Sequence, residues 1–342
     1  MSTFTGGSYP PNLDTALERE RLVQTIKDWT IANGLAVRPP PAIAANDAEG
    51  ILAMSAPVTL FPSPFPKSCF EDARSIQTAY NELYARISQD EEFLSSLVKE
   101  HLARTEYPLL KDPIAASSMD LPDNESSKGL AAGLHAAYHA YGKSALNHPT
   151  CVLFLVQDGE RNVFDQRHLE YALQSFNPTH PIPATAPDYS HPAAWEARYQ
   201  IERSAAIACP TVLTQLAGMK KVQQVLATPG SVASTPSVLR RFVSSDASHS
   251  ALFKTFTNIY PLDTTPAGLE ARRLAADAEE CQKYVMKPQR EGGGNNFYRS
   301  AIPQQLREIS EEHWGSYILM ELITPPPLVN TILRNGELEH GG

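Results

Sequence analysis

The sequence predicts an α/β protein with many helices. Residues 151–156 and 317–320 are continuous apolar runs of strand length, and the first is typical of a strand buried on both faces of a parallel sheet. A third β-leaning segment, at about 282–287, precedes a run of glycines, and segments with helical spacing separate the strands. We therefore expect a mixed or parallel sheet around 151–156, and a second region built on the strands near 282–287 and 316–321.

Helices are predicted before, between and after these strands. Residues 14–33 place Leu22 and Trp29 near helical spacing, and Gly34 stands where a helix-ending glycine belongs. Residues 68–71 (Ser-Cys-Phe-Glu) have the pattern of a capping box, which predicts the start of the next helix. Further helices are expected at about 90–102 and 126–141, from after residue 167 to residue 173, and at about 194–208, 211–227, 236–246 and 266–280.

Polar residues follow the apolar run at 151–156. Open α/β sheets bind ligands at the carboxyl ends of their strands, so the segment 157–167 is either a binding segment or a solvated loop. Residues 177–192 are rich in proline and predict a loose linker. His135 and His139 lie four apart on a predicted helix, but no third ligand is apparent, which favours a partly buried helix face over a metal site.

The segment 287–296 carries three consecutive glycines. Such a backbone can approach a ligand closely and present amide groups to phosphate oxygens. Lys287 could neutralise phosphate and Glu291 could hold a divalent cation. No Gly-Lys-Ser/Thr follows, so this is not a Walker A loop, and a flexible surface turn is the alternative. Lys220 and Lys221 are adjacent on a predicted helix; paired lysines usually face solvent, although one could turn toward phosphates.

Composition narrows the classes of partner. A chain of 342 residues can bury a sizeable core in one large or two smaller domains. The formal net charge of −9 argues against nucleic acid or an anionic membrane as partner. There is no long apolar run and no secretory signal pattern, so neither a membrane span nor export is predicted. Four widely spaced cysteines predict reduced thiols, and we therefore expect a soluble cytoplasmic protein.

Several stretches, in the same order along the chain, resemble eukaryotic glutathione synthetase, a ligase of the ATP-grasp type. They lie at 60–64, 160–167, 195–204, 215–224, 287–296 and 317–321. Phe-Asp-Gln-Arg at 164–167 together with Lys-Pro-Gln-Arg-Glu-Gly-Gly-Gly-Asn-Asn at 287–296 is highly specific. The resemblance spans roughly residues 14–342 and implies ATP- and Mg²⁺-dependent joining of γ-glutamylcysteine to glycine through an acyl phosphate, in a homodimer.

The resemblance also implies roles for individual residues. Lys220 and Lys287 would contact the nucleotide phosphates, the glycine loop would cover them, and a hinge would meet adenine mainly through its backbone. The implied nucleotide-binding residues are Lys220, Lys287, Gly292, Gly293, Gly294, Asn295, Asn296, Tyr298, Met320, Glu321, Leu322 and Ile323. Glu291 would ligate Mg²⁺, and the implied γ-glutamylcysteine-binding residues are Glu160, Asn162 and Gln166. No protein nucleophile is needed, because such catalysis is mostly positioning and charge neutralisation.

The fold implied by the resemblance is incomplete relative to the family. It has an N-terminal helical part of the ATP-grasp region (1–148), a truncated substrate-binding α/β domain (149–210), and a helical part with the glycine-rich lid loop (211–342). A block with two Mg²⁺ ligands is missing where residue 100 runs into residue 101. A proline-rich linker at 179–190 replaces strands and a substrate clamp, and the chain stops at Gly342 before further family strands and a basic loop.

These departures leave three interpretations of the function. The first is a glutathione synthetase-like ligase. The second is a non-catalytic nucleotide-binding or dimerising remnant of the same family, which would bind ATP without forming glutathione. The third sets the family aside and treats the chain as a cytosolic α/β interaction protein, which would fold stably and bind no nucleotide.

Overall fold

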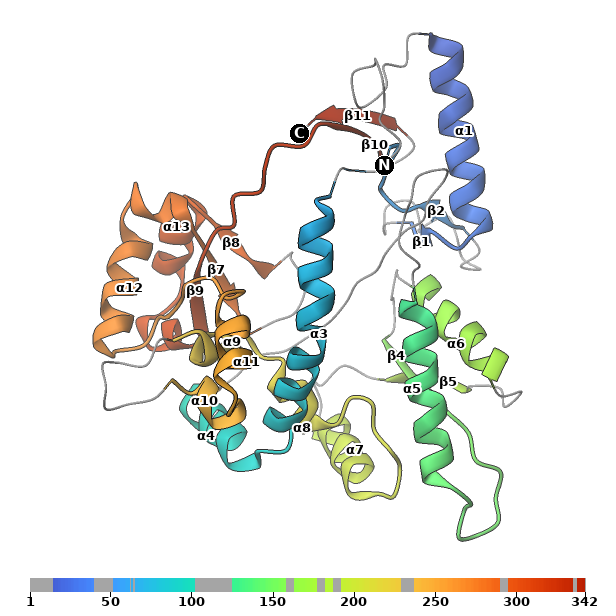
Figure 1. Cartoon of the computed structure of the whole chain (residues 1–342), viewed down its shortest axis with the longest axis horizontal. Coiled ribbons are helices and arrows are strands. Elements are labelled where there is room, and N and C mark those ends of the chain that lie inside the picture. Colours follow the sequence, from blue (N-terminus) through green and yellow to red (C-terminus); the bar gives the residue numbers. More distant parts are fainter. Residues whose placement is uncertain are drawn as a thin grey trace. The chain divides into compact units, whose positions relative to one another are not determined.

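A computed structural model defines residues 15–39, 52–61, 63, 65–101, 125–157, 163–176, 182–186, 192–228, 237–289, 295–334 and 337–341 of the chain. They form a mixed α/β structure that is mostly helical, with small sheets (Figure 1). Contacts divide the chain into two compact units. Unit 1 comprises 1–64, 112–209 and 326–342, and unit 2 comprises 65–111 and 210–325. The three functional parts with boundaries after residues 148 and 210 stay a prediction. No described helix is long and apolar enough to cross a membrane.

Unit 1 has short strands and four described helices, which come from separate segments of the sequence. Its described elements are α1 (Ala16–Ala32), β1 (Ala36–Val37), β2 (Met54–Ser55), β3 (Val58–Thr59), α5 (Ser126–Tyr141), β4 (Leu153–Gln157), α6 (Val163–Phe176), β5 (Ile182–Ala186), α7 (Pro192–Arg203), β10 (Asn330–Arg334) and β11 (Glu337–Gly341). The predicted first helix is confirmed, and Gly34 follows it with φ of +72°, a left-handed conformation that favours glycine. The buried Thr30 hydroxyl lies 2.7 Å from that of Ser55, which ties α1 to β2.

The strand predicted at 151–156 is present as β4, and it pairs in parallel with β5. The predicted loose linker is therefore wrong at 182–186, where the chain forms β5. Pro183 is compatible with this strand because β5 has only one neighbour among the described strands, and edge strands tolerate the missing amide. Burial of β4 on both faces is also wrong, since Leu153 and Leu155 are 51% and 50% exposed.

Strands β10 and β11 form an antiparallel hairpin, and β3 pairs with the other edge of β10. The buried side chain of Asn330 donates from Nδ2 to the carbonyl of Phe61 at 2.8 Å and to Ser63 Oγ at 3.2 Å. These bonds join residues more than 260 positions apart in the sequence. The end of the described chain is thus attached to an early segment of the same unit.

Unit 2 combines helices with a four-stranded sheet. Its described elements are α3 (Lys67–Ile87), α4 (Glu91–His101), α8 (Val212–Ala217), α9 (Lys220–Ala227), α10 (Leu239–Phe242), α11 (Asp246–Phe253), β6 (Ile259–Pro261), α12 (Pro266–Ala276), η1 (Glu280–Lys283), β7 (Tyr284–Pro288), β8 (Phe297–Tyr298), α13 (Ala301–Glu308), η3 (Glu311–Ser316) and β9 (Tyr317–Glu321). The sheet has the order β6-β9-β7-β8, and every neighbouring pair is antiparallel. The strands predicted near 282–287 and 316–321 are β7 and β9.

The two faces of this sheet are covered by different helices (Figure 1). Met286 and Leu319 are opposite each other in the register and fully buried on the face covered by α12 and α13. Ile318 is fully buried on the other face, where it packs with Ala227 of α9 and Ile259. Burying a side chain of this size contributes about 1.5–3 kcal/mol. The alternation along β7 and β9 therefore divides their residues between two cores.

Several helix predictions in unit 2 need correction. The capping box at 68–71 is wrong: α3 begins at Lys67, Pro66 is its N-cap, and no side chain caps it. The helix predicted at 211–227 is interrupted at Gly218 and continues as α9. The helix predicted at 236–246 is replaced by the short α10 and by α11, which begins at Asp246 where Ser245 caps it.

The start of α4 agrees with the prediction of a helix from Asp90. The Asp90 carboxylate accepts the amide of Phe93 at 3.0 Å, and Arg241 donates to both of its oxygens at 2.6 and 2.8 Å. Arg241 also lies over the Phe93 ring, 5.7 Å from its centroid. One carboxylate thus caps α4 and joins it to α10, two segments about 150 residues apart in the sequence.

We predict that Asp90→Ala lowers the free energy of unfolding by about 1–2 kcal/mol, because it removes a helix cap and a bidentate partner of Arg241. Urea denaturation followed by circular dichroism measures the change. Asp72→Ala, on the exposed side of α3, is the matched control and should change stability by less than about 0.5 kcal/mol. Equal effects of the two substitutions would contradict the role of Asp90 as a cap.

Candidate functional site

The β7–β9 register places Lys287 on one face of the sheet with several predicted nucleotide-binding residues. Lys287 is opposite Ile318, and Val285 is opposite both Met320 on β9 and Tyr298 on β8. Directly opposed residues of an antiparallel pair share a face, and so do alternate residues of one strand. Lys287, Met320 and Tyr298 therefore lie on the same face, which is the face that α9 covers.

The first turn of α9 lies at the end of β7. The side chain of Gln289, two residues after Lys287, accepts the backbone amide of Lys221 at 2.9 Å. Lys220 is the first residue of α9 and is half-buried, as is Lys287. Segments 67 residues apart thus bring the two predicted phosphate-binding lysines to one end of the sheet. This site lies entirely within unit 2.

Lys221 does not face solvent, so the expectation for paired lysines is wrong for this residue. Its side chain is 3% exposed, and its Nζ lies 3.6 Å from Asp263 Oδ2. Asp263 Oδ1 in turn accepts the amide of Thr265 at 3.0 Å. A buried cation needs such a partner because desolvation is costly. Lys221 therefore attaches α9 to the loop between β6 and α12.

The predicted hinge, Met320–Ile323, is held at the end of β9. The amide of Glu321 donates to the carbonyl of Asn258 at 3.0 Å, and that of Leu322 donates to the carbonyl of Lys283 at 2.9 Å. Ile323 is 75% exposed, and none of the described residues accepts its backbone amide. The hinge is thus anchored by two amides, and the next amide along the chain can meet a ligand.

The Glu321 side chain points to the opposite face from Lys287. Its Oε1 accepts hydrogen bonds from Asn258 Nδ2 at 2.9 Å and from the Tyr260 hydroxyl at 3.2 Å. Burial, and then the neighbouring Glu321 charge, raise the pKa of Tyr260 to about 12. Burial and the same charge also raise the pKa of Tyr284. The Glu321 carboxylate therefore stabilises the sheet through Asn258 and Tyr260. This agrees with a hinge that contacts adenine through backbone atoms and not through this side chain.

Three predicted nucleotide-binding residues that follow the glycine run are described: Asn295, Asn296 and Tyr298. Asn296 Nδ2 donates to the Tyr298 hydroxyl at 3.2 Å, and Tyr298 is 48% exposed. Asn295 and Asn296 are half-buried. Glu291, Gly292, Gly293 and Gly294 lie outside the described residues, as do Glu160 and Asn162, and their predicted roles stay predictions.

In unit 1, Gln166 is half-buried in the first turn of α6. This helix follows β4 in the sequence and packs against α5. Further along α6, Arg167 forms an ion pair with the buried Glu170. Gln166 thus follows the carboxyl end of β4 in the sequence, as predicted.

His135 and His139 are neighbours on α5, with their Nε2 atoms 3.1 Å apart. His135 is partly buried and its ring stacks on that of Phe176, 5.4 Å between centroids. Among the described residues no group of three potential metal ligands occurs. The arrangement agrees with the predicted partly buried helix face.

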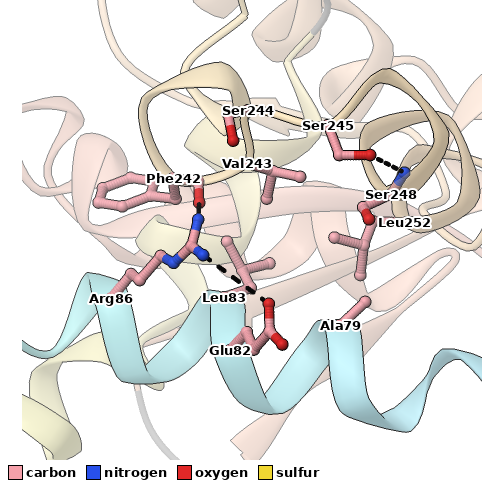
Figure 2. A pocket seen from close by; sticks show the side chains of 10 residues that line it. All are labelled: Ala79, Glu82, Leu83, Arg86, Phe242, Val243, Ser244, Ser245, Ser248 and Leu252. Carbon is pink, nitrogen blue, oxygen red and sulfur yellow. Dashed lines mark hydrogen bonds and ion pairs between the residues drawn. The ribbon is translucent and has the colours of Figure 1, made fainter.

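A separate pocket lies between α3 and the α10–α11 segment (Figure 2). Arg86 donates to the carbonyl of Phe242 at 2.7 Å and lies 3.8 Å from a carboxylate oxygen of Glu82. The pocket is thus lined by a cation that already has protein partners, together with serines such as Ser245, which caps α11. Sequence reasoning missed this pocket, because its lining comes from distant segments that share no motif. It contains none of the predicted site residues.

The family model described as eukaryotic glutathione synthase, ATP binding domain, matches residues 16–109 and 98–342. The chain belongs to this family. It is 30% identical to the glutathione synthetase large chain of Schizosaccharomyces pombe, over 92% of this chain and 85% of that one. It is 31% identical to the glutathione synthetase of Homo sapiens, over 93% of this chain and 84% of that one. The interpretation that set the family aside is therefore wrong.

A solved structure shares the fold. The apo form of a glutathione synthetase-like effector from Globodera pallida matches with a TM-score of 0.62 and 19% identity, over 94% of this chain and 84% of that chain. This likeness supports the ATP-grasp fold of the glutathione synthetase family for the chain.

The chain lacks internal segments that its relatives contain. The alignment with the Schizosaccharomyces pombe protein spans 438 positions, although this chain has 342 residues. At least 96 of those positions therefore lie opposite gaps in this chain. The two stretches matched by the family model meet at residues 98–109, which agrees with the missing block predicted at residues 100–101.

We predict that Tyr260 makes the stability of the chain fall at high pH. Its folded-state pKa of about 12 is above the ordinary value of 10.0, so its contribution is complete below pH 10 and is lost as the pH rises toward 12. The difference in free energy of unfolding between the wild type and Tyr260→Phe should therefore shrink above pH 10. Urea denaturation at a series of pH values measures it.

Glu321→Gln is the matched variant for this test. It keeps an acceptor for the Tyr260 hydroxyl but removes the negative charge, so the pH-dependent loss should still begin near pH 10 but should end at a lower pH than in the wild type. A difference between wild type and Tyr260→Phe that stays constant from pH 9 to pH 11 would show that Tyr260 titrates alike in the folded and unfolded chains.

Proposed function

We propose that the chain binds ATP at the β7–β9 face of unit 2. The observation that carries this proposal is the hydrogen bond from the first turn of α9, which begins at Lys220, to Gln289, two residues after Lys287. Lys287 lies on the sheet face that also holds Met320 and Tyr298. Two cations suit a polyphosphate, and an apolar sheet face next to a hinge suits an adenine ring. Membership of a family whose matching region is described as an ATP binding domain supports the same proposal.

Each part of the site has a distinct task in this proposal. Lys220 and Lys287 neutralise the phosphates, and Gly292, Gly293 and Gly294 approach the phosphates with Asn295, Asn296 and Tyr298 beside them. The backbone amide of Ile323, an exposed residue, contacts the adenine ring edge, beside the Met320 side chain and next to the anchored Glu321 and Leu322. Glu291 would hold Mg²⁺, which would offset the negative charge of the phosphates. Because Mg²⁺ in such sites is held mainly by phosphates and water, one or two carboxylates are enough.

We further propose that the chain is a glutathione synthetase-like ligase, which joins γ-glutamylcysteine to glycine. The terminal phosphate of ATP passes to the cysteinyl carboxylate, and the glycine amine then displaces phosphate from the acyl phosphate. Glu160, Asn162 and Gln166 hold γ-glutamylcysteine. These residues orient the reactants and offset charge, and none of them forms a covalent bond to the substrate. The proposed setting is a cytoplasmic homodimer.

A second candidate function is nucleotide binding without ligation, in a remnant that binds ATP or dimerises. At least 96 positions of a relative have no counterpart in this chain, and one structural relative is described as a glutathione synthetase-like effector rather than a synthetase. Phosphate release from ATP that depends on both γ-glutamylcysteine and glycine would favour the ligase. ATP binding with no such release would favour the remnant.

We predict that Lys287→Ala weakens ATP binding in the presence of Mg²⁺ by about 10- to 100-fold, because it removes one charged contact to phosphate. Isothermal titration calorimetry measures the affinity, and Lys220→Ala should have an effect of the same direction. Lys283→Ala is the control, since the exposed Lys283 side chain is paired with Glu280 at 2.8 Å, and the substitution keeps the backbone carbonyl that accepts the Leu322 amide. An ATP affinity of Lys287→Ala equal to that of the wild type would contradict the proposed site.

A further inference from the structure

Helix α9, which carries Lys220, begins without a cap of its own. The first amides of a helix have no partner within the helix, so a side chain or water must accept them. In unit 2, the helices α8, α11 and α12 begin after Thr211, Ser245 and Thr265, and each of these hydroxyls accepts an amide of its own helix. Helix α9 begins after Met219, whose side chain has no oxygen to offer.

Gln289 supplies the missing cap from another element. Its Oε1 accepts the amide of Lys221, in the first turn of α9, at 2.9 Å, and its Nε2 donates to the carbonyl of Ser316 at 3.3 Å. The side chain is 1% exposed. The opposite orientation of the amide would place a donor against a donor and an acceptor against an acceptor, so these two partners determine the orientation.

This one side chain joins three segments of the site. Gln289 follows β7 directly, Ser316 precedes β9, and Lys221 lies in the first turn of α9. Lys287 is two residues before Gln289 on the chain, and Lys220 is one residue before the amide that Gln289 accepts. Gln289 therefore links the two segments that carry these lysines.

The Lys221 side chain holds the same turn from a second direction. While its amide is bonded to Gln289, its Nζ lies 3.6 Å from Asp263 Oδ2. Both contacts involve buried groups, where an unmatched hydrogen-bonding partner is costly. The first turn of α9 is thus attached at its backbone and at a side chain, and its orientation is restricted.

We propose that Gln289 is a positioning residue for the nucleotide phosphates: by capping α9 from the end of β7, it holds Lys220 at the separation from Lys287 that a polyphosphate requires. This inference rests on the ATP site proposed above. Gln289 acts through the two lysines and touches no ligand. Contacts to the adenosine part of the nucleotide, which come from the hinge at the end of β9, do not depend on this cap.

The test compares ATP with adenosine. We expect Gln289→Met to weaken ATP binding by about five- to tenfold, the equivalent of one lost helix cap, while adenosine affinity changes by less than about twofold. Hydrogen exchange of the amides in α9 should become faster in this variant. Gln304→Met, an exposed glutamine of α13 that bonds only to the neighbouring Glu308 side chain at 3.3 Å, is the control and should change neither quantity.

The outcomes separate this inference from the site on which it rests. Wild-type ATP affinity in Gln289→Met, or an equal loss for ATP and adenosine, would overturn the positioning role and leave the ATP site standing. Failure of the wild type to bind ATP would overturn both. If Gln289→Met does not fold, Gln289→Asn gives the same comparison, because its amide is one methylene closer to the backbone. We expect this variant also to lose affinity for ATP but not for adenosine.

Discussion

The antiparallel pairing of β7 with β9 is the constraint on which the rest of unit 2 depends. The register opposes Lys287 to Ile318 and Met286 to Leu319, so neighbouring residues face opposite sides of the sheet. One side completes the core with α12 and α13, and the other side presents Lys287 and Met320. A slip of one residue would exchange the two sides and bury Lys287 among apolar side chains. The same alternation thus stabilises the unit and forms the candidate site.

Helix α9 completes the site at the cost of burying charged and polar groups. Lys221 and Gln289 are 3% and 1% exposed, and an apolar pair in their place would pack without any need for partners. Their bonds to Asp263 and Ser316 offset the desolvation and give α9 a single orientation. Buried polar groups of this kind contribute more to geometric specificity than to net stability. Such a desolvation cost is expected where a charged side chain, here Lys220, must be held in place.

Local patterns predicted the elements whose signals lie within a few residues. The apolar run of β9, the glycine that follows α1, and the aspartate that caps α4 are examples, because each acts on its own segment. Long-range pairing explains the errors. Pro183 suggested a linker because the sequence does not show that β4 pairs with β5. Lys221 was expected to face solvent because the sequence does not show that Asp263 lies 3.6 Å from its Nζ. The motif at 287–296 identified the family and the face of the site, but no local pattern indicated that Gln289 caps a distant helix.

The residues of the two proposed halves of the chemistry belong to different units of the chain. Lys220, Lys287 and the hinge all belong to unit 2, whose three buried clusters consist of residues of that unit alone. Gln166 belongs to unit 1, where Leu153 and Leu155 of the neighbouring strand are half-exposed. The retained residues of the proposed nucleotide site are held by contacts within unit 2. Of the predicted gaps, however, the block at residues 100–101 falls within unit 2, and the strands replaced at 179–190 fall within unit 1. Both proposed activities are therefore affected, and nucleotide binding and ligation have to be measured separately.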